Sequence, residues 1–296
     1  MKVWGRERAD EVMALVAAAL PGENLTDDDV VANLFDDPDP VRVVADDAGR
    51  GVASAVVRGG TAAGAAGRPV VHLQLLAVDP SAHRLGVGTA LVAELERWAF
   101  DDVGAGAVVI GAGAPFYLFA GADVHATAAL CLFESMGYVA RGAELNLSFP
   151  SRFRAPAPAG VELVRVLEED DAAAVEAFCG AQWPNWIPEL RRGIEHGACH
   201  FARRQDDGDV VGFGCHSVNR LGWLGPIGTD PSGRRSGVGT ALLSAISKDV
   251  MAAGFDTVEV SWIGPIGFYA KAAGASVSRV FRSLALPWSA WCDRRA

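Results

Sequence analysis

The 296-residue sequence has few cysteines, and none of them forms a closely spaced pair. Its five cysteines are odd in number and scattered along the chain, at Cys131, Cys179, Cys199, Cys215 and Cys292. A disulfide framework or a structural zinc site needs even or clustered cysteines, for example in C-x-x-C pairs. The pattern therefore argues against both and is typical of a protein in a reducing compartment.

Long hydrophobic runs are also missing. No apolar run approaches the ~20 residues that cross a bilayer, and the helical pattern ending at Leu20 is followed at once by Pro21-Gly22. The N-terminus, Met1-Lys2-Val3-Trp4, has no apolar core of a signal peptide. The sequence therefore predicts a cytoplasmic protein with no membrane partner.

Basic residues are also few relative to acidic ones, 26 against 36, which gives a formal net charge of −10. Phosphate backbones are bound by basic surfaces, so nucleic acid is not an expected partner. An acidic surface suits a cationic substrate such as an amine, or it simply keeps the protein soluble.

An internal repeat is the strongest positive signal. Residues 79–91 read DPSAHRLGVGTAL and residues 230–242 read DPSGRRSGVGTAL, identical at ten of thirteen positions. The offset of 151 is about half the chain, which indicates a duplicated domain.

The flanks of the repeat indicate the same order of elements in each half. A strand-like run precedes each motif, and a helical pattern follows it: Leu91, Val92, Leu95 and Trp98 in one half, Leu242, Leu243, Ile246 and Val250 in the other. Gly104 and Gly254 are the predicted C-terminal caps. A second strand, a short helix and a final strand complete each half. The prediction is an N-terminal domain 1–150, a Pro/Ala linker 151–160 and a C-terminal domain 161–296.

The R-x-G-x-G-T turn between a strand and a helix suggests an anion site. Glycines leave room for a phosphate, while backbone N–H groups and the helix dipole favour negative charge there. The turn is neither a Walker A loop, because no G-K-[ST] follows, nor a G-x-G-x-x-G dinucleotide fingerprint. The alternative is a helix-start turn that needs glycine only for tight packing.

The motif resembles motif A of the GCN5-related N-acetyltransferases, the GNAT family, whose signature is Q/R-x-x-G-x-G/A. The resemblance implies an α/β (α+β) fold of two tandem domains, each a mixed, mainly antiparallel twisted sheet flanked by helices. It also implies acetyl-CoA as co-substrate, bound through its pyrophosphate. The implied cofactor-binding residues are Ile227, Gly228, Thr229, Arg234, Arg235, Ser236, Gly237, Val238, Gly239 and Thr240, with Arg84, Gly86 and Gly88 in the N-terminal copy.

The C-terminal copy matches the family better and is the expected catalytic one. Gly267-Phe268-Tyr269-Ala270-Lys271 resembles the family's tyrosine-bearing segment, which makes Tyr269 the candidate acid for the leaving thiolate. The alternative is a tyrosine that only packs in the core. In the N-terminal copy Phe133 stands in that place and His83 replaces the first arginine of the signature.

A base and an oxyanion donor are also needed for direct acetyl transfer. Glu259 interrupts the apolar strand Val258-Glu259-Val260 and is the candidate base, directly or through water, unless it only faces solvent. A backbone N–H around Gly228 is the candidate oxyanion donor, because Gly225-Pro226-Ile227-Gly228 disrupts its strand. His72, His196, His200 and His216 show no metal-ligand spacing with carboxylates, so no metal is expected.

The N-terminal copy has about fourteen extra residues, 113–126, between its last β-run and final helix. Their aromatic and acidic groups suggest a lid or substrate wall, or else a hydrophobic loop at a domain interface.

The expected activity is transfer of an acetyl group to a primary amine of a small molecule. Tandem members of this family that carry a W-x-G-P-x-x-F-Y segment look similar to bacterial enzymes that act on amino sugars such as glucosamine. Here the segment reads Trp262-Ile263-Gly264-Pro265-Ile266-Gly267-Phe268-Tyr269. A non-catalytic acyl-CoA sensor is the alternative. The sequence specifies neither the acceptor nor the oligomeric state.

Overall fold

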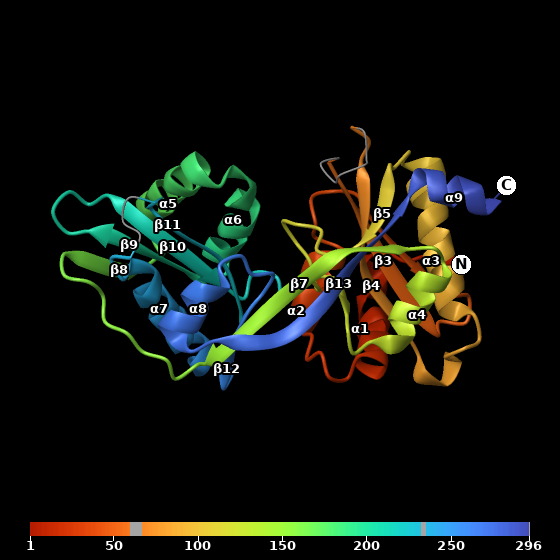
Figure 1. The fold of residues 1–296 in the computed structure, drawn as a ribbon, viewed down its shortest axis with the longest axis horizontal. Coiled ribbons are helices and arrows are strands. Elements are labelled where there is room, and N and C mark those ends of the chain that lie inside the picture. The colour runs from red at the N-terminus through yellow and green to blue at the C-terminus, as the bar shows by residue number, and fades with distance from the viewer. Residues whose placement is uncertain (60–66, 232–234, 296) are drawn as a thin grey trace. The chain divides into compact units, whose positions relative to one another are not determined.

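The chain divides into two compact units in the computed structural model, which describes residues 1–59, 67–231 and 235–295. Unit 1 combines Met1–Glu144 with Val280–Ala296, and unit 2 comprises Leu145–Arg279. Each unit contains one sheet with helices on both faces (Figure 1).

The sheet of unit 1 has the strand order β1-β2-β3-β4-β5-β13, with β6 paired to β13. The β4–β5 pairing is parallel, and the pairings β1–β2, β2–β3, β3–β4, β5–β13 and β6–β13 are antiparallel. Its strands are β1 (Lys2–Val3), β2 (Val41–Ala45), β3 (Gly51–Arg58), β4 (Val70–Val78), β5 (Ala107–Ile110), β6 (Ala122–Asp123) and the end of β13 (Ser276–Pro287).

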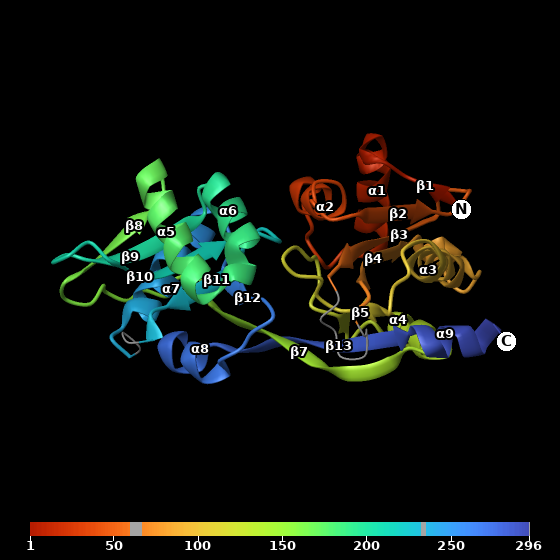
Figure 2. The ribbon, with the colours of Figure 1, turned by 90° about the horizontal axis from the view of Figure 1, so that it is seen from above.

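The helices of unit 1 cover both faces of this sheet (Figure 2). Helices α1 (Ala9–Ala19) and α2 (Asp27–Leu34) pack on one face. Helices α3 (Val87–Arg97), α4 (Thr127–Ser135) and α9 (Trp288–Arg295) pack on the other. A short π-helical turn over Trp98–Asp102 extends α3, and 3₁₀ turns lie at Arg6–Arg8 and Pro80–Ala82.

Unit 2 repeats this plan with the strand order β7-β12-β11-β10-β9-β8, in which only β11–β12 is parallel. Its strands are β7 (Val139–Pro150), β8 (Val161–Arg165), β9 (Cys199–Arg204), β10 (Val210–His216), β11 (Trp223–Thr229) and β12 (Thr257–Val260). Helices α5 (Glu169–Gln182) and α6 (Ile187–Glu195), joined by a 3₁₀ turn at Pro184–Trp186, cover one face. Helices α7 (Val238–Ala252) and α8 (Ile266–Ala273) cover the other. The predicted fold class, a mixed and mainly antiparallel sheet flanked by helices in two tandem copies, is confirmed.

The composition of the units differs from the contiguous halves expected at 1–150 and 161–296. The end of β7 pairs with β12 in unit 2, through Leu147↔Val260 to Pro150↔Thr257. The end of β13 pairs with β5 in unit 1, through Leu284↔Ile110 to Pro287↔Ala107. Each half of the sequence therefore contributes its final strand to the sheet of the other half.

The helices after the two motifs follow the predicted apolar spacing. Leu91, Val92 and Leu95 on α3 are fully buried, as are Leu242, Leu243 and Ile246 on α7. Gly254 and Gly104 both adopt positive φ after the helical segments, which is the conformation of a C-terminal glycine cap. These contacts fix the start of each helix against its sheet, directly after the glycine turn.

Candidate active site

The glycine turn has the same backbone conformation in both units. Arg84 and Arg235 have φ of +61° and +72°, and the helix N-caps Gly86 and Gly237 have φ of +81° and +94°. No side chain among the described residues caps either α3 or α7. The first backbone N–H groups of both helices are therefore left for another acceptor, such as a phosphate.

The predicted cofactor residues have different surroundings in unit 2. Arg235 and Ser236 are exposed, whereas the Val238 side chain is buried beside Leu242, so that only its backbone can reach a ligand. Arg234 lies outside the described residues. Gly237, Gly239 and Thr240 are half-buried at the start of α7.

The two signature glycines serve different purposes. Gly237 has a positive φ that favours glycine. A Cβ on Gly239 would lie 3.0 Å from the Phe268 ring of α8, so this glycine lets α7 and α8 pack closely. Gly88 in unit 1 is similar, because a Cβ there would lie 3.3 Å from Leu132. Gly239 and Gly88 therefore allow close helix packing, whereas Gly237 and Gly86 allow a backbone with positive φ.

The strand before the motif separates from its parallel neighbour. β11 pairs with β12 only at Trp223↔Glu259 and Leu224↔Val260, after which the two strands part. Asp230 N–H donates to Val211 of β10, and successive residues of a strand bond to opposite sides. By this alternation the Gly228 N–H faces β10, while the N–H groups of Ile227 and Thr229 face the opening. The candidate oxyanion donors near Gly228 are therefore its two neighbours.

An aromatic cluster covers Gly228 on the face opposite α7. A Cβ on Gly228 would lie 2.5 Å from the Trp183 ring, so only glycine fits. Trp183 stacks on Trp186 with ring centroids 5.2 Å apart and also contacts Phe178 and Phe213. This face of β11 is thus lined by aromatic rings.

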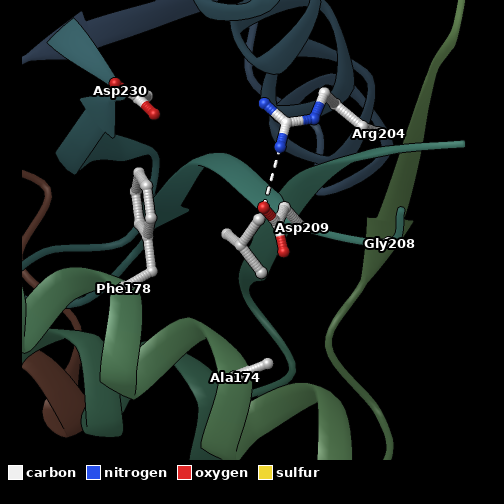
Figure 3. Close-up of a pocket in the computed structure, with 7 residues that line it drawn as sticks. Ala174, Phe178, Arg204, Gly208, Asp209 and Asp230 are labelled. Carbon is white, nitrogen blue, oxygen red and sulfur yellow. Dashed lines mark hydrogen bonds and ion pairs between the residues drawn. The ribbon is translucent and has the colours of Figure 1, made fainter. Parts of the chain in front are cut away.

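A pocket of about 310 Å³ lies next to this cluster (Figure 3). Phe178 of α5 forms one wall, and Asp230, which directly follows β11, forms another (Figure 3). Arg204 and Asp209 form an ion pair of 2.7 Å at its edge. The pocket therefore combines an apolar wall with two carboxylates beside the start of the glycine turn.

Tyr269 lies on α8 in the core that α7 and α8 form with β11 and β12. It is 5% exposed, and its neighbour Phe268 contacts the start of α7 at Gly239. Its hydroxyl has no hydrogen-bond partner within the described residues, and burial raises the pKa of this hydroxyl well above its ordinary value. The hydroxyl stays protonated at neutral pH, as a proton donor must.

Glu259 is half-buried on β12 and faces away from α7, because its neighbours Val258 and Val260 are buried on the α7 face. Asn146 of β7, which is fully buried, donates to Glu259 Oε1 at 2.6 Å. Asn146 Oδ1 in turn accepts from the Trp262 N–H. Glu259 is in register with Trp223, and Trp223 lies four residues before Ile227 on β11. Glu259 is therefore about 13 Å along the strand direction from the Ile227 N–H.

Unit 1 has the same parting of strands, but the residues beside it differ from those in unit 2. β4 pairs with β5 only up to Leu73↔Ile110. His83 Nε2 bonds the carbonyl oxygen of Val78, the counterpart of Thr229. Phe133, at the position of Tyr269, packs edge-on against Tyr138 at 5.4 Å.

The extra segment 113–126 packs within unit 1. Arg58 Nε donates to the Gly113 carbonyl at 2.9 Å and Arg58 Nη2 to the Phe116 carbonyl at 3.2 Å. Leu118 is buried with Leu75 and Ala77, the latter being the counterpart of Gly228. The start of this segment is thus part of the unit 1 core, against the face of β4 where the strands part.

Sequence reasoning missed two polar clusters in unit 2. Glu189 of α6 is 7% exposed, accepts a 2.9 Å hydrogen bond from Asn219, and has its pKa raised to about 7 by burial. His200 and His216, which have no carboxylate at ligand spacing in the sequence, meet Asp249 of α7 in the structure. Neither cluster has a local sequence signal, because its members come from separate elements.

One known protein family matches both halves of the chain. The family model described as acetyltransferase (GNAT) family matches residues 9–118 and 163–275. No curated protein sequence matches the chain.

Several solved structures share the fold. A tandem GNAT protein from the clavulanic acid biosynthesis pathway has a TM-score of 0.70 at 17% identity, over 96% of this chain and 97% of its own. A GCN5-related N-acetyltransferase from Sphaerobacter thermophilus gives 0.65 at 19%, over 97% and 94%. The glucosamine N-acetyltransferase region of a fungal multidomain β-N-acetylglucosaminidase gives 0.72 at 18%, over 96% of this chain and only 38% of that one.

Within the described residues, no helix combines the length and apolar character that crossing a bilayer requires. The two matched regions each contain one glycine turn and the strand parting before it. Since the family model covers most of the chain in two separate copies, the chain belongs to the GNAT family of acetyltransferases as a tandem member.

Proposed function

We propose that unit 2 transfers the acetyl group of acetyl-CoA to a primary amine of a small molecule by direct attack. The observation that carries this proposal is the opening between β11 and β12. The opening lies between Leu224 and the glycine turn, where helix α7 begins without a side-chain cap. The N–H groups of Ile227 and Thr229 face it. Only five residues, 261–265, connect β12 to α8 on its other side. Among the described residues of unit 1, His83 and the segment from Gly113 lie beside the corresponding strand β4.

The cofactor assignment follows from charge and backbone geometry. The pyrophosphate binds the first N–H groups of α7, from Gly237 to Thr240, with Arg234 and Arg235 supplying positive charge. The thioester lies along β11, where the N–H of Ile227 or Thr229 stabilises its oxygen as negative charge develops. Gly228 contributes by its missing side chain, since Trp183 occupies that space.

The chemistry needs two proton transfers. The amine nitrogen attacks the carbonyl carbon and loses a proton, and the C–S bond breaks as the thiolate takes a proton from Tyr269. Glu259 receives the amine proton through water, because its position beside Trp223 is too distant for direct contact at Ile227. The hydrogen bond that Asn146 donates to Glu259 Oε1 fixes the position of this carboxylate.

The acceptor approaches on the face of β11 that Trp183 covers, with Trp186 stacked on Trp183. Aromatic rings stack on planar or sugar-like groups, and the carboxylates of Asp209 and Asp230 suit a positively charged amine. The structural likeness to a fungal glucosamine N-acetyltransferase region supports an amino sugar as the first acceptor to test. The scattered cysteines support a cytoplasmic location.

The test is thiol release from acetyl-CoA by the full chain across a panel of amines that includes glucosamine. We expect turnover with at least one amine, and turnover lowered by ~10²–10⁴ when Tyr269 is replaced by Phe. Tight acetyl-CoA binding by calorimetry without thiol release from any amine would contradict the proposal and favour an acyl-CoA sensor instead.

A further inference from the structure

Two histidines of unit 2 point at one carboxylate oxygen. His200 Nε2 lies 2.6 Å and His216 Nε2 lies 3.2 Å from Asp249 Oδ2. The histidines stand on the neighbouring strands β9 and β10, where His200 is in register with Gly214, two residues before His216. All three ligand atoms lie within 4.8 Å of one another. The three side chains therefore converge on a single point under α7.

The surroundings of this cluster orient the ligand atoms. His216 Nδ1 lies 3.0 Å from Ser217 Oγ, which leaves Nε2 directed at Asp249. Arg165 Nη2 lies 2.5 Å from Asp249 Oδ1, so the other carboxylate oxygen is the one presented to the histidines. Such outer hydrogen bonds are the usual support of metal-binding histidines and carboxylates. His200 and His216 are only 8% and 9% exposed, so the cluster is held in the interior.

We propose that His200, His216 and Asp249 bind a divalent first-row metal ion, with Zn²⁺ as the first ion to test. Two imidazoles and one carboxylate form a common ligand set for Zn²⁺, and water completes the tetrahedron. Ligand atoms around tetrahedral zinc lie about 3.3 Å apart, given bond lengths of about 2.0–2.2 Å. The His216–Asp249 distance of 3.2 Å already matches, and the His200–Asp249 distance of 2.6 Å would lengthen by about 0.7 Å on metal binding.

The site is distinct from the acetyl-transfer site. Asp249 lies near the C-terminal end of α7, more than two turns from the glycine turn at its start. The ion would join α7 to β9 and β10, so its expected effect is on the stability of unit 2. The proposal does not depend on the proposed function.

The experiment uses the full chain after treatment with a chelator, titrated with Co²⁺ alone and followed by its visible d–d absorption. We expect one ion per chain and bands of a tetrahedral nitrogen and oxygen site, without the charge-transfer band of cysteine ligands. Asp249→Asn keeps a hydrogen-bond acceptor but is a poor ligand, and His216→Gln removes one imidazole. Each should weaken binding by at least about tenfold. His196→Gln, at an exposed histidine of the same unit, is the matched control and should change nothing.

A second readout keeps the result clear if a variant is unstable. Zn²⁺ should raise the melting temperature of the parent and of His196→Gln, but not of Asp249→Asn. The proposal is overturned if Co²⁺ gives no tetrahedral bands. It is also overturned if both ligand variants bind as tightly as the parent, or if Zn²⁺ leaves the parent's melting temperature unchanged.

Discussion

The two units carry the same glycine turn on the same backbone, yet they differ in what lies beside it. In unit 2 Tyr269 is buried in one core with Leu224 and Val260, the last paired residues before the opening, and its helix also contacts the turn. In unit 1 the exposed His83 bonds the Val78 carbonyl of β4, and Leu118 of the segment beginning at Gly113 packs on β4 with Leu75 and Ala77. We infer from this comparison that the residues beside the turn, and not the turn itself, distinguish the two units.

A buried ion pair anchors the segment that closes unit 1. Arg58 is 7% exposed and binds both oxygens of Asp37, at 2.8 and 2.6 Å. The same guanidinium donates to the carbonyls of Gly113 and Phe116. Removing one partner of such a buried pair is costly, so the closed state of unit 1 is firmly held.

The sharpest test of the difference is Tyr269→Phe, which gives unit 2 the residue that unit 1 has at Phe133. We expect kcat to fall by ~10²–10⁴ with acetyl-CoA affinity unchanged, because a positioned acid is lost. The melting temperature should also stay the same, because the hydroxyl has no partner within the described residues. Near-normal turnover, measured as thiol release, would show that the thiolate leaves without help.

The next test compares the two N-cap glycines, Gly237→Ala and Gly86→Ala. Both positions have positive φ, so each variant should lose roughly 1–2 kcal/mol of unfolding free energy. Only Gly237→Ala should weaken acetyl-CoA binding, by about 10- to 100-fold, through loss of charge-assisted hydrogen bonds. Calorimetry and chemical denaturation measure the two effects separately. Equal loss of affinity in both variants would remove the distinction between the units.

Glu189 offers a test through pH, because burial raises its pKa to about 7 in the folded chain. A carboxyl group with a higher pKa in the folded than in the unfolded chain stabilises the folded chain while it is protonated. This stabilisation is lost as the pH rises from about 4 to 7. Glu189→Gln cannot ionise. Its unfolding free energy relative to the parent should therefore rise by on the order of 3 kcal/mol between pH 4 and pH 8.

Urea denaturation at several pH values measures this difference. Glu195→Gln, at an exposed residue of the same helix, controls for the loss of one charge. A constant difference between parent and Glu189→Gln across the range would mean that the carboxyl is not buried in solution. The counterpart helix in unit 1, α2, uses its buried Asp29 in a capping box with Thr26 instead.

The smallest effect is expected from the reciprocal change, Phe133→Tyr. It restores the tyrosine to unit 1 but leaves His83 and the segment from Gly113 in place. We therefore expect no gain in thiol release in the Tyr269→Phe background. Recovery of turnover in the double variant would show that the opening of unit 1 is accessible after all.

The sequence predicted the local parts of this protein well, because they depend on nearby residues. The apolar spacing of Leu242, Leu243 and Ile246 predicted the buried face of α7. The repeated turn has positive φ at the same two positions in both copies. By contrast, the sequence offered a packing role for the glycines only as an alternative. The Phe268 ring that packs against Gly239 lies on another helix, so no local pattern reveals the contact.

By itself the sequence determined the duplication, the order of elements in each copy and the two glycine turns, since periodicity and turn chemistry are local. Only the tertiary structure decided which sheet receives β7 and which receives β13. Strand pairing uses backbone hydrogen bonds and an alternating pattern that both copies share, so either sheet suits either strand. The same limit applies to His200, His216 and Asp249, which meet because two strands and one helix pack together. Their spacing along the chain carries no trace of that contact.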